Sequence, residues 1–184
     1  HPEQGTQTTV AFSNGNTLPI VARPSGHAHF APETAGEDTE RWYSPAADEF
    51  LGIRLTHMPS PWIGDYGWLR ISADVSECSP CLRPGLVVRD ANAGWALSPY
   101  LCALPLQRDE CTILMKLSPT ERCAIMSLTF APGTARRRLL VELPASRGRA
   151  WISVVKDRGR LTGKSAQHCG GADSEFGCYF SISI

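Results

Sequence analysis

The sequence predicts an all-β protein, an antiparallel β-sandwich of the supersandwich type with few or no helices. Short apolar segments recur at intervals of about eight to twelve residues, and turn residues separate them. Fourteen prolines and sixteen glycines are spread along the 184 residues rather than clustered, as frequent turns between short strands require. No convincing amphipathic helix of about ten residues or more is found.

The elements follow from local patterns. Residues 1–10 are polar and are expected to form a flexible N-terminal arm before a domain over residues 11–184. Four prolines between residues 11 and 57 exclude long helices there. Residues 68–73 alternate apolar and polar side chains, as a half-buried strand does. The extended segments expected along the chain are residues 18–22, 28–30, 50–55, 68–73, 86–88, 95–97, 100–106, 111–117, 122–130, 138–143, 150–155 and 179–184.

The charge balance excludes some partners. Eighteen basic and eighteen acidic residues cancel, so the basic excess of a nucleic-acid-binding protein is missing. The one basic cluster, residues 136–138, is expected to be a solvated turn. No stretch reaches the roughly 20 apolar residues that cross a bilayer, so no membrane span is expected. The chain begins with His1 rather than Met, which suggests a leader that has been removed.

Seven cysteines favour a secreted protein with disulfides over a cytosolic zinc protein. Cys78 and Cys81 have metal-ligand spacing, but no second pair follows. The odd cysteine is expected to be a free thiol or a bridge to another chain. Two pairs are nine residues apart, which suits hairpin or loop staples: Cys102 with Cys111, and Cys169 with Cys178.

The densest candidate binding segment is residues 55–67, L-T-H-M-P-S-P-W-I-G-D-Y-G. Two prolines stiffen this loop, and two glycines allow tight turns. Such a loop can offer Trp62 to the apolar face of a pyranose ring while His57 and Asp65 hydrogen-bond to hydroxyl groups. The alternative is a rigid structural loop with Trp62 in the core.

Other chemistry has weaker support. His27 and His29 point to opposite faces if they lie on a strand, so they are expected to be ordinary polar positions. An amino-terminal His1 could chelate copper, as in the polysaccharide monooxygenases, but no motif supplies its partner. No early pair of acids has a spacing that selects it for glycoside hydrolysis. The sequence therefore assigns no catalytic residue and no metal ligand.

Three blocks in order resemble the N-terminal domain of family 92 glycoside hydrolases. They are G-N-T-L-P with F-A-P-E-T at residues 15–34, R-W-Y-S at residues 41–44 and G-I-R-L-T-H-M-P-S-P-W-I-G-D-Y-G at residues 52–67. The family patterns are G-N-T-x-P, T-P-x-T, G-W-x-Y and T-H-Q-P-S-P-W-x-x-D-Y-G. The third block is the specific one, and the resemblance covers roughly residues 11–184. Met58 replaces the usual Gln, and Arg41 replaces the usual Gly.

The resemblance implies part of a calcium-dependent, inverting exo-α-mannosidase. In that family a β-sandwich precedes a helical (α/α)6 barrel, which supplies the acid, the base and the calcium ligands. The partners implied are a mannose-containing glycan and a second chain or downstream domain that carries the barrel. This chain is then expected to be inactive alone; the alternative is a non-catalytic carbohydrate-binding or structural module of an extracellular assembly. The substrate-binding positions carried over are Gly15, Asn16, Trp42, His57, Trp62 and Asp65.

Overall fold

The computed structural model describes residues 2–6, 17–34, 42–57, 67–76, 85–87, 90–143, 150–166, 173 and 175–184. The all-β prediction is confirmed, because the described chain forms antiparallel strands with only short 3-10 turns between them. The strands are β1 (His29–Thr34), β2 (Glu49–Thr56), β3 (Leu69–Asp74), β4 (Gly85–Val87), β5 (Ala96–Ser98), β6 (Leu101–Arg108), β7 (Cys111–Pro119), β8 (Ala124–Phe130), β9 (Arg138–Glu142), β10 (Trp151–Val155), β11 (Arg160–Ser165) and β12 (Cys178–Ser183). No described helix has the length and apolar character to cross a membrane.

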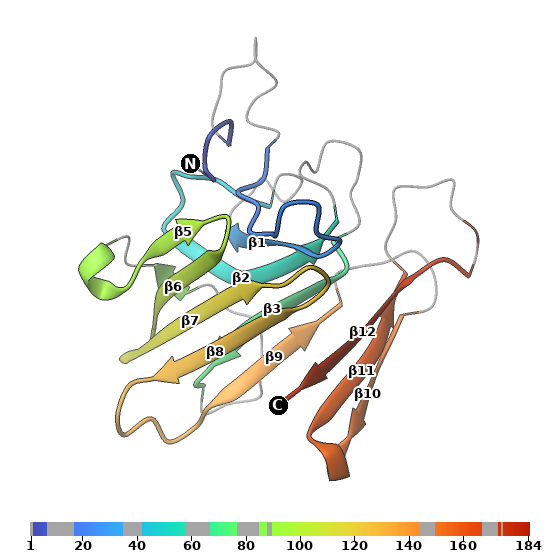
Figure 1. Ribbon diagram of the computed structural model, residues 1–184. Coiled ribbons are helices and arrows are strands. Elements are labelled where there is room, and N and C mark those ends of the chain that lie inside the picture. Colours follow the sequence, from blue (N-terminus) through green and yellow to red (C-terminus); the bar gives the residue numbers. More distant parts are fainter. Residues whose placement is uncertain are drawn as a thin grey trace.

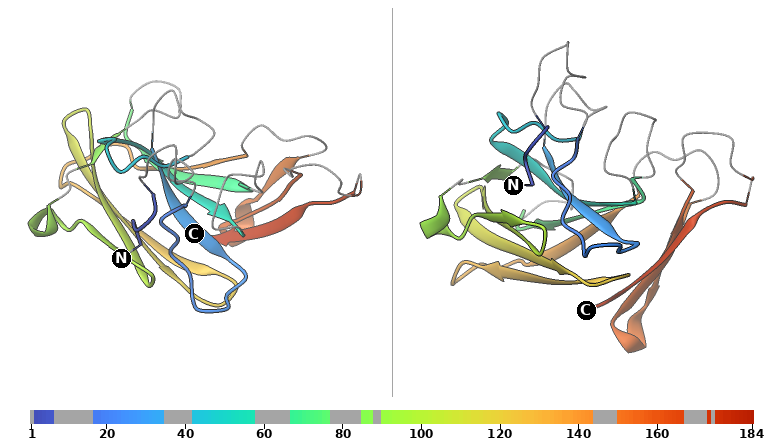
Figure 2. Two further views of the ribbon diagram at one scale, coloured as in Figure 1. Left: turned by 90° about the horizontal axis from the view of Figure 1, so that it is seen from above. Right: turned by 45° about the horizontal axis from the view of Figure 1, so that its top comes forward.

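Nine strands form one large curled sheet, and three form a smaller one (Figure 1). The large sheet has the order β8-β7-β6-β4-β2-β3-β9, with β1 added to β2 and β5 added to β6. The smaller sheet has the order β10-β11-β12 and stands at an angle beside the larger one (Figure 2). Strand β2 therefore connects three other strands of the large sheet, since it pairs with β1, β3 and β4.

The core lies within the curl of the large sheet. On β7 the side chains of Ile113, Met115 and Leu117 are buried and alternate with more exposed ones, as the period of a strand requires. The ring of Phe50 on β2 meets those of Tyr43 and Trp95 edge-on, with ring centroids 6.2 and 6.1 Å apart. This apolar cluster fixes the sheet that carries the candidate site.

The smaller sheet leaves an apolar face uncovered by the described residues. Its register brings Val154, Leu161 and Ile182 side by side, with the row Ile152, Gly163 and Phe180 next to it. Val154 is 61% exposed, and Ile152 is 38% exposed. Contiguous exposed apolar surface is typical of protein interaction sites.

The strand prediction missed one strand and shortened another. Strand β11, with the sequence R-L-T-G-K-S, has no apolar alternation, yet it pairs with β12 along its whole length and with β10 from Arg160 to Lys164. Strand β1 continues to Thr34 through Pro32, which is tolerated because β2 is the only named strand that pairs with β1, and the bridge on its other side joins Phe30, not Pro32, to Val21. In the expected arm, Glu3 accepts a hydrogen bond from the hydroxyl of Tyr43.

The proposed hairpin staple between Cys102 and Cys111 is wrong. Strands β6 and β7 pair Cys102 with Leu117 and Arg108 with Cys111, so the two sulfurs lie at opposite ends of the ladder. Both thiols are free, as are those of Cys123 and Cys178. Burial raises the pKa of the Cys102 thiol to about 12, which keeps it protonated. Residues Cys78, Cys81 and Cys169 lie outside the described part.

The basic cluster at residues 136–138 is only partly a solvated turn. Arg136 and Arg137 are exposed, but Arg138 donates from Nη1 to the fully buried Asp74 at 3.1 Å. Burial alone would raise the pKa of Asp74. The hydroxyl and backbone N–H of Ser76, together with Arg138, outweigh burial and lower this pKa below its ordinary value.

Replacing Ser76 by alanine should therefore destabilise the protein in a pH-dependent way. A carboxyl whose folded pKa is lowered contributes stability above its unfolded pKa, about 3.9, and loses it as the pH falls through the folded value. At pH 7 the Ser76→Ala variant should lose about 2 kcal/mol, and this gap from the parent should close toward pH 2. Urea unfolding at a series of pH values measures it, with the exposed Ser127→Ala as control. A gap that does not change with pH would contradict the assignment.

Candidate functional site

Two of the predicted site residues, Trp42 and His57, lie in the described part of the chain. They contact two residues that are consecutive in the sequence. Trp42 contacts Gly67, and His57 contacts Trp68, directly after the loop motif and before β3. Both contacts lie at the end of the large sheet where β2 leads into the motif. The other predicted site residues, Gly15, Asn16, Trp62 and Asp65, lie outside the described residues.

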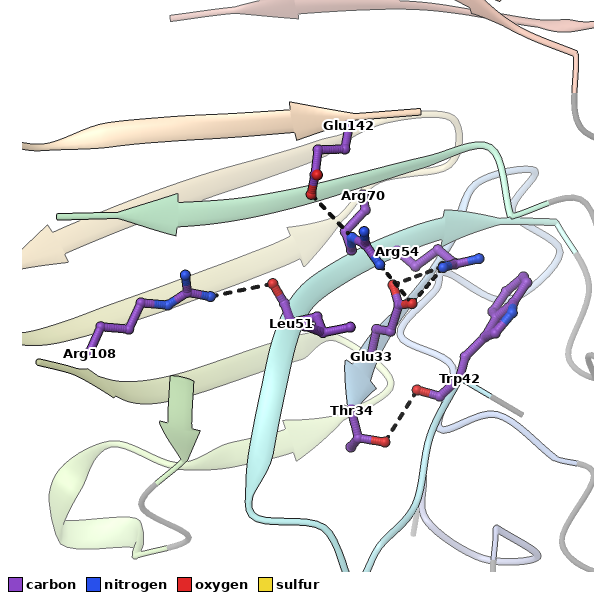
Figure 3. Close-up of polar contacts among 8 residues, drawn as sticks. All are labelled: Glu33, Thr34, Trp42, Leu51, Arg54, Arg70, Arg108 and Glu142. Atoms are coloured by element: carbon purple, nitrogen blue, oxygen red, sulfur yellow. Dashed lines mark hydrogen bonds and ion pairs between the residues drawn. The ribbon is translucent and has the colours of Figure 1, made fainter. Parts of the chain in front are cut away.

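Trp42 is buried and has an unusual backbone. Its φ is +58°, a left-handed conformation that bulky residues rarely adopt. Its carbonyl accepts hydrogen bonds from the backbone N–H of Thr34 at 2.8 Å and from the Thr34 hydroxyl at 3.4 Å (Figure 3). Its indole lies against the guanidinium of Arg54, whose Cζ is 4.2 Å from the ring centroid. The indole position is thus fixed from both its backbone and its ring.

A ladder of charges, buried at Glu33 and Arg54 and partly exposed at Glu142, lies beside this indole and joins four strands (Figure 3). Glu33 on β1 accepts two hydrogen bonds from Arg54 on β2, at 2.9 and 2.5 Å, and a third from Arg70 on β3 at 3.0 Å. Arg70 also contacts Glu142 on β9 at 3.3 Å. Two positive and two negative groups balance, and Glu33 and Arg54 are only 5% and 6% exposed. The pairing of these four charged groups stabilises the ladder, because a buried charge without a partner would cost free energy of folding.

His57 stacks on Trp68 at the start of the motif. The ring centroids are 5.0 Å apart, and the planes differ by 11°. The backbone N–H of Trp68 donates to Leu55 on β2 at 2.9 Å, which fixes the spacing of the two rings. The indole nitrogen of Trp68 is buried without a hydrogen-bond partner. The chain on either side of the motif, between β2 and β3, is therefore held together by this aromatic contact.

The titratable groups described near the site include a paired carboxylate and scattered histidines. Glu33 is surrounded by guanidinium N–H donors, so its carboxylate is already occupied. Within the described residues, no three His, Cys, Asp or Glu side chains gather as a metal site would require. His27 is exposed and His29 is half-buried on β1. His1 and His168 lie outside the described part, so the structure gives no geometry for the copper hypothesis.

Sequence reasoning missed Arg54, Arg70, Gly67 and Trp68 as parts of this site. The local pattern gave no signal for the two arginines, because a charged side chain between apolar neighbours is what a half-buried strand predicts on its solvent face. Packing requires a glycine at position 67, since an added Cβ would lie 2.6 Å from Cη2 of Trp42 and 2.7 Å from Nη1 of Arg54. That close approach depends on tertiary packing and cannot be read from the motif alone.

Comparison with known proteins places this geometry in a family. Residues 1–184 match the glycosyl hydrolase family 92 N-terminal domain. An inverting mannosidase of family GH92 from Bacteroides thetaiotaomicron is 27% identical, with a TM-score of 0.83 over 100% of this chain and 24% of its own. A second GH92 glycosyl hydrolase is 16% identical, with a TM-score of 0.64 over 87% of this chain and 22% of its own, and is similar in fold alone. No curated protein matches the sequence significantly.

The chain spans about a quarter of the length of both solved relatives. The family match nevertheless covers every residue of the present sequence, including the three blocks that carry the resemblance. The chain belongs to the N-terminal domains of glycosyl hydrolase family 92.

Proposed function

We propose that this domain supplies sugar-contacting residues to a mannoside-binding site that a companion catalytic domain completes. Family membership supports a glycan substrate, and the 27% identical relative is an inverting mannosidase of which this chain covers 24%. The observation that carries the proposal is the attachment of the loop motif. Its described ends, His57 and Gly67, meet Trp68 and the strained Trp42. Strained backbone held by its surroundings is typical of functional sites.

Each residue has a role suited to a neutral sugar. The indole of Trp62 would lie against the apolar C–H face of a mannose ring, and the indole of Trp42, which is 7% exposed and stacked on Arg54, would border the same site and contact the sugar through the small part that remains exposed. His57 and Asp65 would hydrogen-bond to its hydroxyl groups, and Gly15 and Asn16 would let the backbone approach closely. The substrate class is a mannose-containing glycan.

The chemistry itself is assigned to the companion domain. Inverting hydrolysis needs a carboxylic acid and a carboxylate on opposite sides of the bond. Of the described acids in the ladder beside Trp42, Glu33 is bound by two arginines and Glu142 by one, so neither fits that role or that of a calcium ligand. We therefore assign the acid, the base and the calcium to the companion.

The uncovered face of the smaller sheet is the proposed contact with the companion. Val154→Asp would place a charge within that apolar row, and it should reduce association at least tenfold because the carboxylate would be desolvated. Ile125→Asp on β8 is the matched control, since Ile125 is 74% exposed on the large sheet. Affinity measured by surface plasmon resonance checks this. Equal affinities of the two variants would contradict the contact.

Kinetics on the domain joined to its companion tests the function. The isolated chain should release no mannose from an aryl α-mannoside, and the joined protein should release it. Trp42→Phe and His57→Gln should each lower kcat/KM at least tenfold. The control is Trp95→Phe, a tryptophan that packs in the core on Phe50. Unchanged kcat/KM in both site variants would refute the assignment of these residues.

One outcome of these kinetics would favour the alternative function, that of a non-catalytic carbohydrate-binding or structural module. In that case the joined protein would bind mannosides without hydrolysing them.

We also propose that the protein is secreted, because seven cysteines in 184 residues are many for a cytosolic chain. Fractionation of the producing cells tests this, and an exclusively intracellular protein would contradict it.

A further inference from the structure

The left-handed backbone of Trp42 needs restraints that the neighbouring residues provide. With φ at +58°, this bulky residue occupies a sparsely populated region. The two hydrogen bonds from Thr34 fix its carbonyl, and the N–H of Ser44 donates back to the Thr34 hydroxyl at 3.0 Å. These bonds define where the side chain leaves the backbone, but they do not define how the indole is turned.

The indole ring of Trp42 is in contact with Arg54 and Gly67. The guanidinium carbon lies 4.2 Å from the centroid of the indole, and Gly67 lies against Cζ2 and Cη2 of the same ring. Arg54 therefore stacks on the indole of Trp42, and Gly67 packs closely against both the indole and the guanidinium. Any larger residue at position 67 would displace either the ring or the guanidinium.

The guanidinium itself cannot turn. Its Nε and Nη2 both donate to Glu33, at 2.9 and 2.5 Å, in the two-point geometry that a planar fork allows. Glu33 is held in turn by Arg70, and Arg70 by Glu142. The position of one indole thus depends on a chain of charges that extends from β1 to β9.

We propose that Arg54 is a positioning residue that sets the indole of Trp42 for sugar binding; this rests on the proposed function, in which Trp42 contacts the sugar. Arg54 does not itself bind substrate in this account, since it is buried and Glu33 occupies two of its nitrogens. The planar fork, and not charge alone, is what the site requires. Lysine in its place would keep the charge and lose the plane.

The test combines a spectroscopic and a kinetic readout. The near-UV circular dichroism of Trp42 is isolated by subtracting the spectrum of Trp42→Phe in each background. This difference should change in Arg54→Lys and stay unchanged in Arg138→Lys, whose arginine pairs with Asp74. In the protein joined to its companion, Arg54→Lys should raise KM at least tenfold. Adding Trp42→Phe should cause no comparable second loss, because both changes remove the same interaction.

The outcomes separate the two proposals. If the Trp42 difference spectrum is the same in Arg54→Lys as in the parent, Arg54 does not set the indole, and this inference is overturned whatever the kinetics show. If the two substitutions lose activity additively, it is overturned as well. If the spectrum changes and Trp42→Phe leaves KM and kcat unchanged, Arg54 still positions the indole and the proposed sugar contact of Trp42 fails instead.

Discussion

Replacing Gly52 by alanine should be among the most destabilising single substitutions in this domain. Gly52 has a φ of +154°, and an added Cβ would lie 2.4 Å from the carbonyl oxygen of Ile71 on the neighbouring β3. Backbone strain and crowding against a main-chain atom each contribute roughly 1–3 kcal/mol, so the loss should be about 4 kcal/mol. Thermal unfolding should show a melting temperature lower by about 10 °C.

Gly133→Ala separates the two causes. Gly133 also has a positive φ, +82°, but an added Cβ there would meet nothing within 4 Å. Its loss should be about 1 kcal/mol, the cost of the left-handed conformation alone. If Gly52→Ala were as mild as Gly133→Ala, the close approach of β2 and β3 would be refuted.

Replacing Glu33 by alanine should have the second large effect. It would leave the guanidinium groups of Arg54 and Arg70 without their shared carboxylate in a buried place. Breaking a buried pair in this way costs about 3–5 kcal/mol, because the remaining charge is not compensated. Urea unfolding measures the loss, which should change little between low and high salt since the group is shielded from solvent.

Glu142→Ala is the control for Glu33. Its side chain is 35% exposed, and its contact with Arg70 is longer, at 3.3 Å. A partly exposed pair of this kind should contribute about 1 kcal/mol or less. Equal losses for the two variants would show that burial of Glu33 does not govern the strength of the ladder.

Local patterns in the sequence predicted the strands where side chains alternate, and they failed where pairing depends on distant residues. Strand β7 was predicted because Ile113, Met115 and Leu117 follow the period of a strand. Strand β11 has no such pattern. At Gly163 the missing side chain makes room for the ring of Phe180, whose Cζ would lie 2.3 Å from an added Cβ. That fit exists only once β12 is in place.

The candidate site likewise contains residues that the sequence predicted and residues that it did not. The resemblance identified Trp42 and the loop motif, because these residues carry their pattern in short stretches. The ladder could not be identified, since Glu33 and Arg54 are 21 positions apart and meet only through the register of β1 on β2. The cysteine prediction failed for the same reason: spacing along the chain suggested the bridge between Cys102 and Cys111, and the β6–β7 register excludes it.

Sugar binding is tested most directly by NMR on the five indole N–H signals, assigned through single tryptophan-to-phenylalanine variants. During titration with methyl α-mannoside, the signals of Trp42 and Trp62 should move together and saturate, while those of Trp95 and Trp151 stay fixed. Binding should be weak, because this chain holds only part of the proposed site. Signals of Trp42 and Trp62 that remain still at saturating sugar, or movement confined to Trp151, would contradict the account.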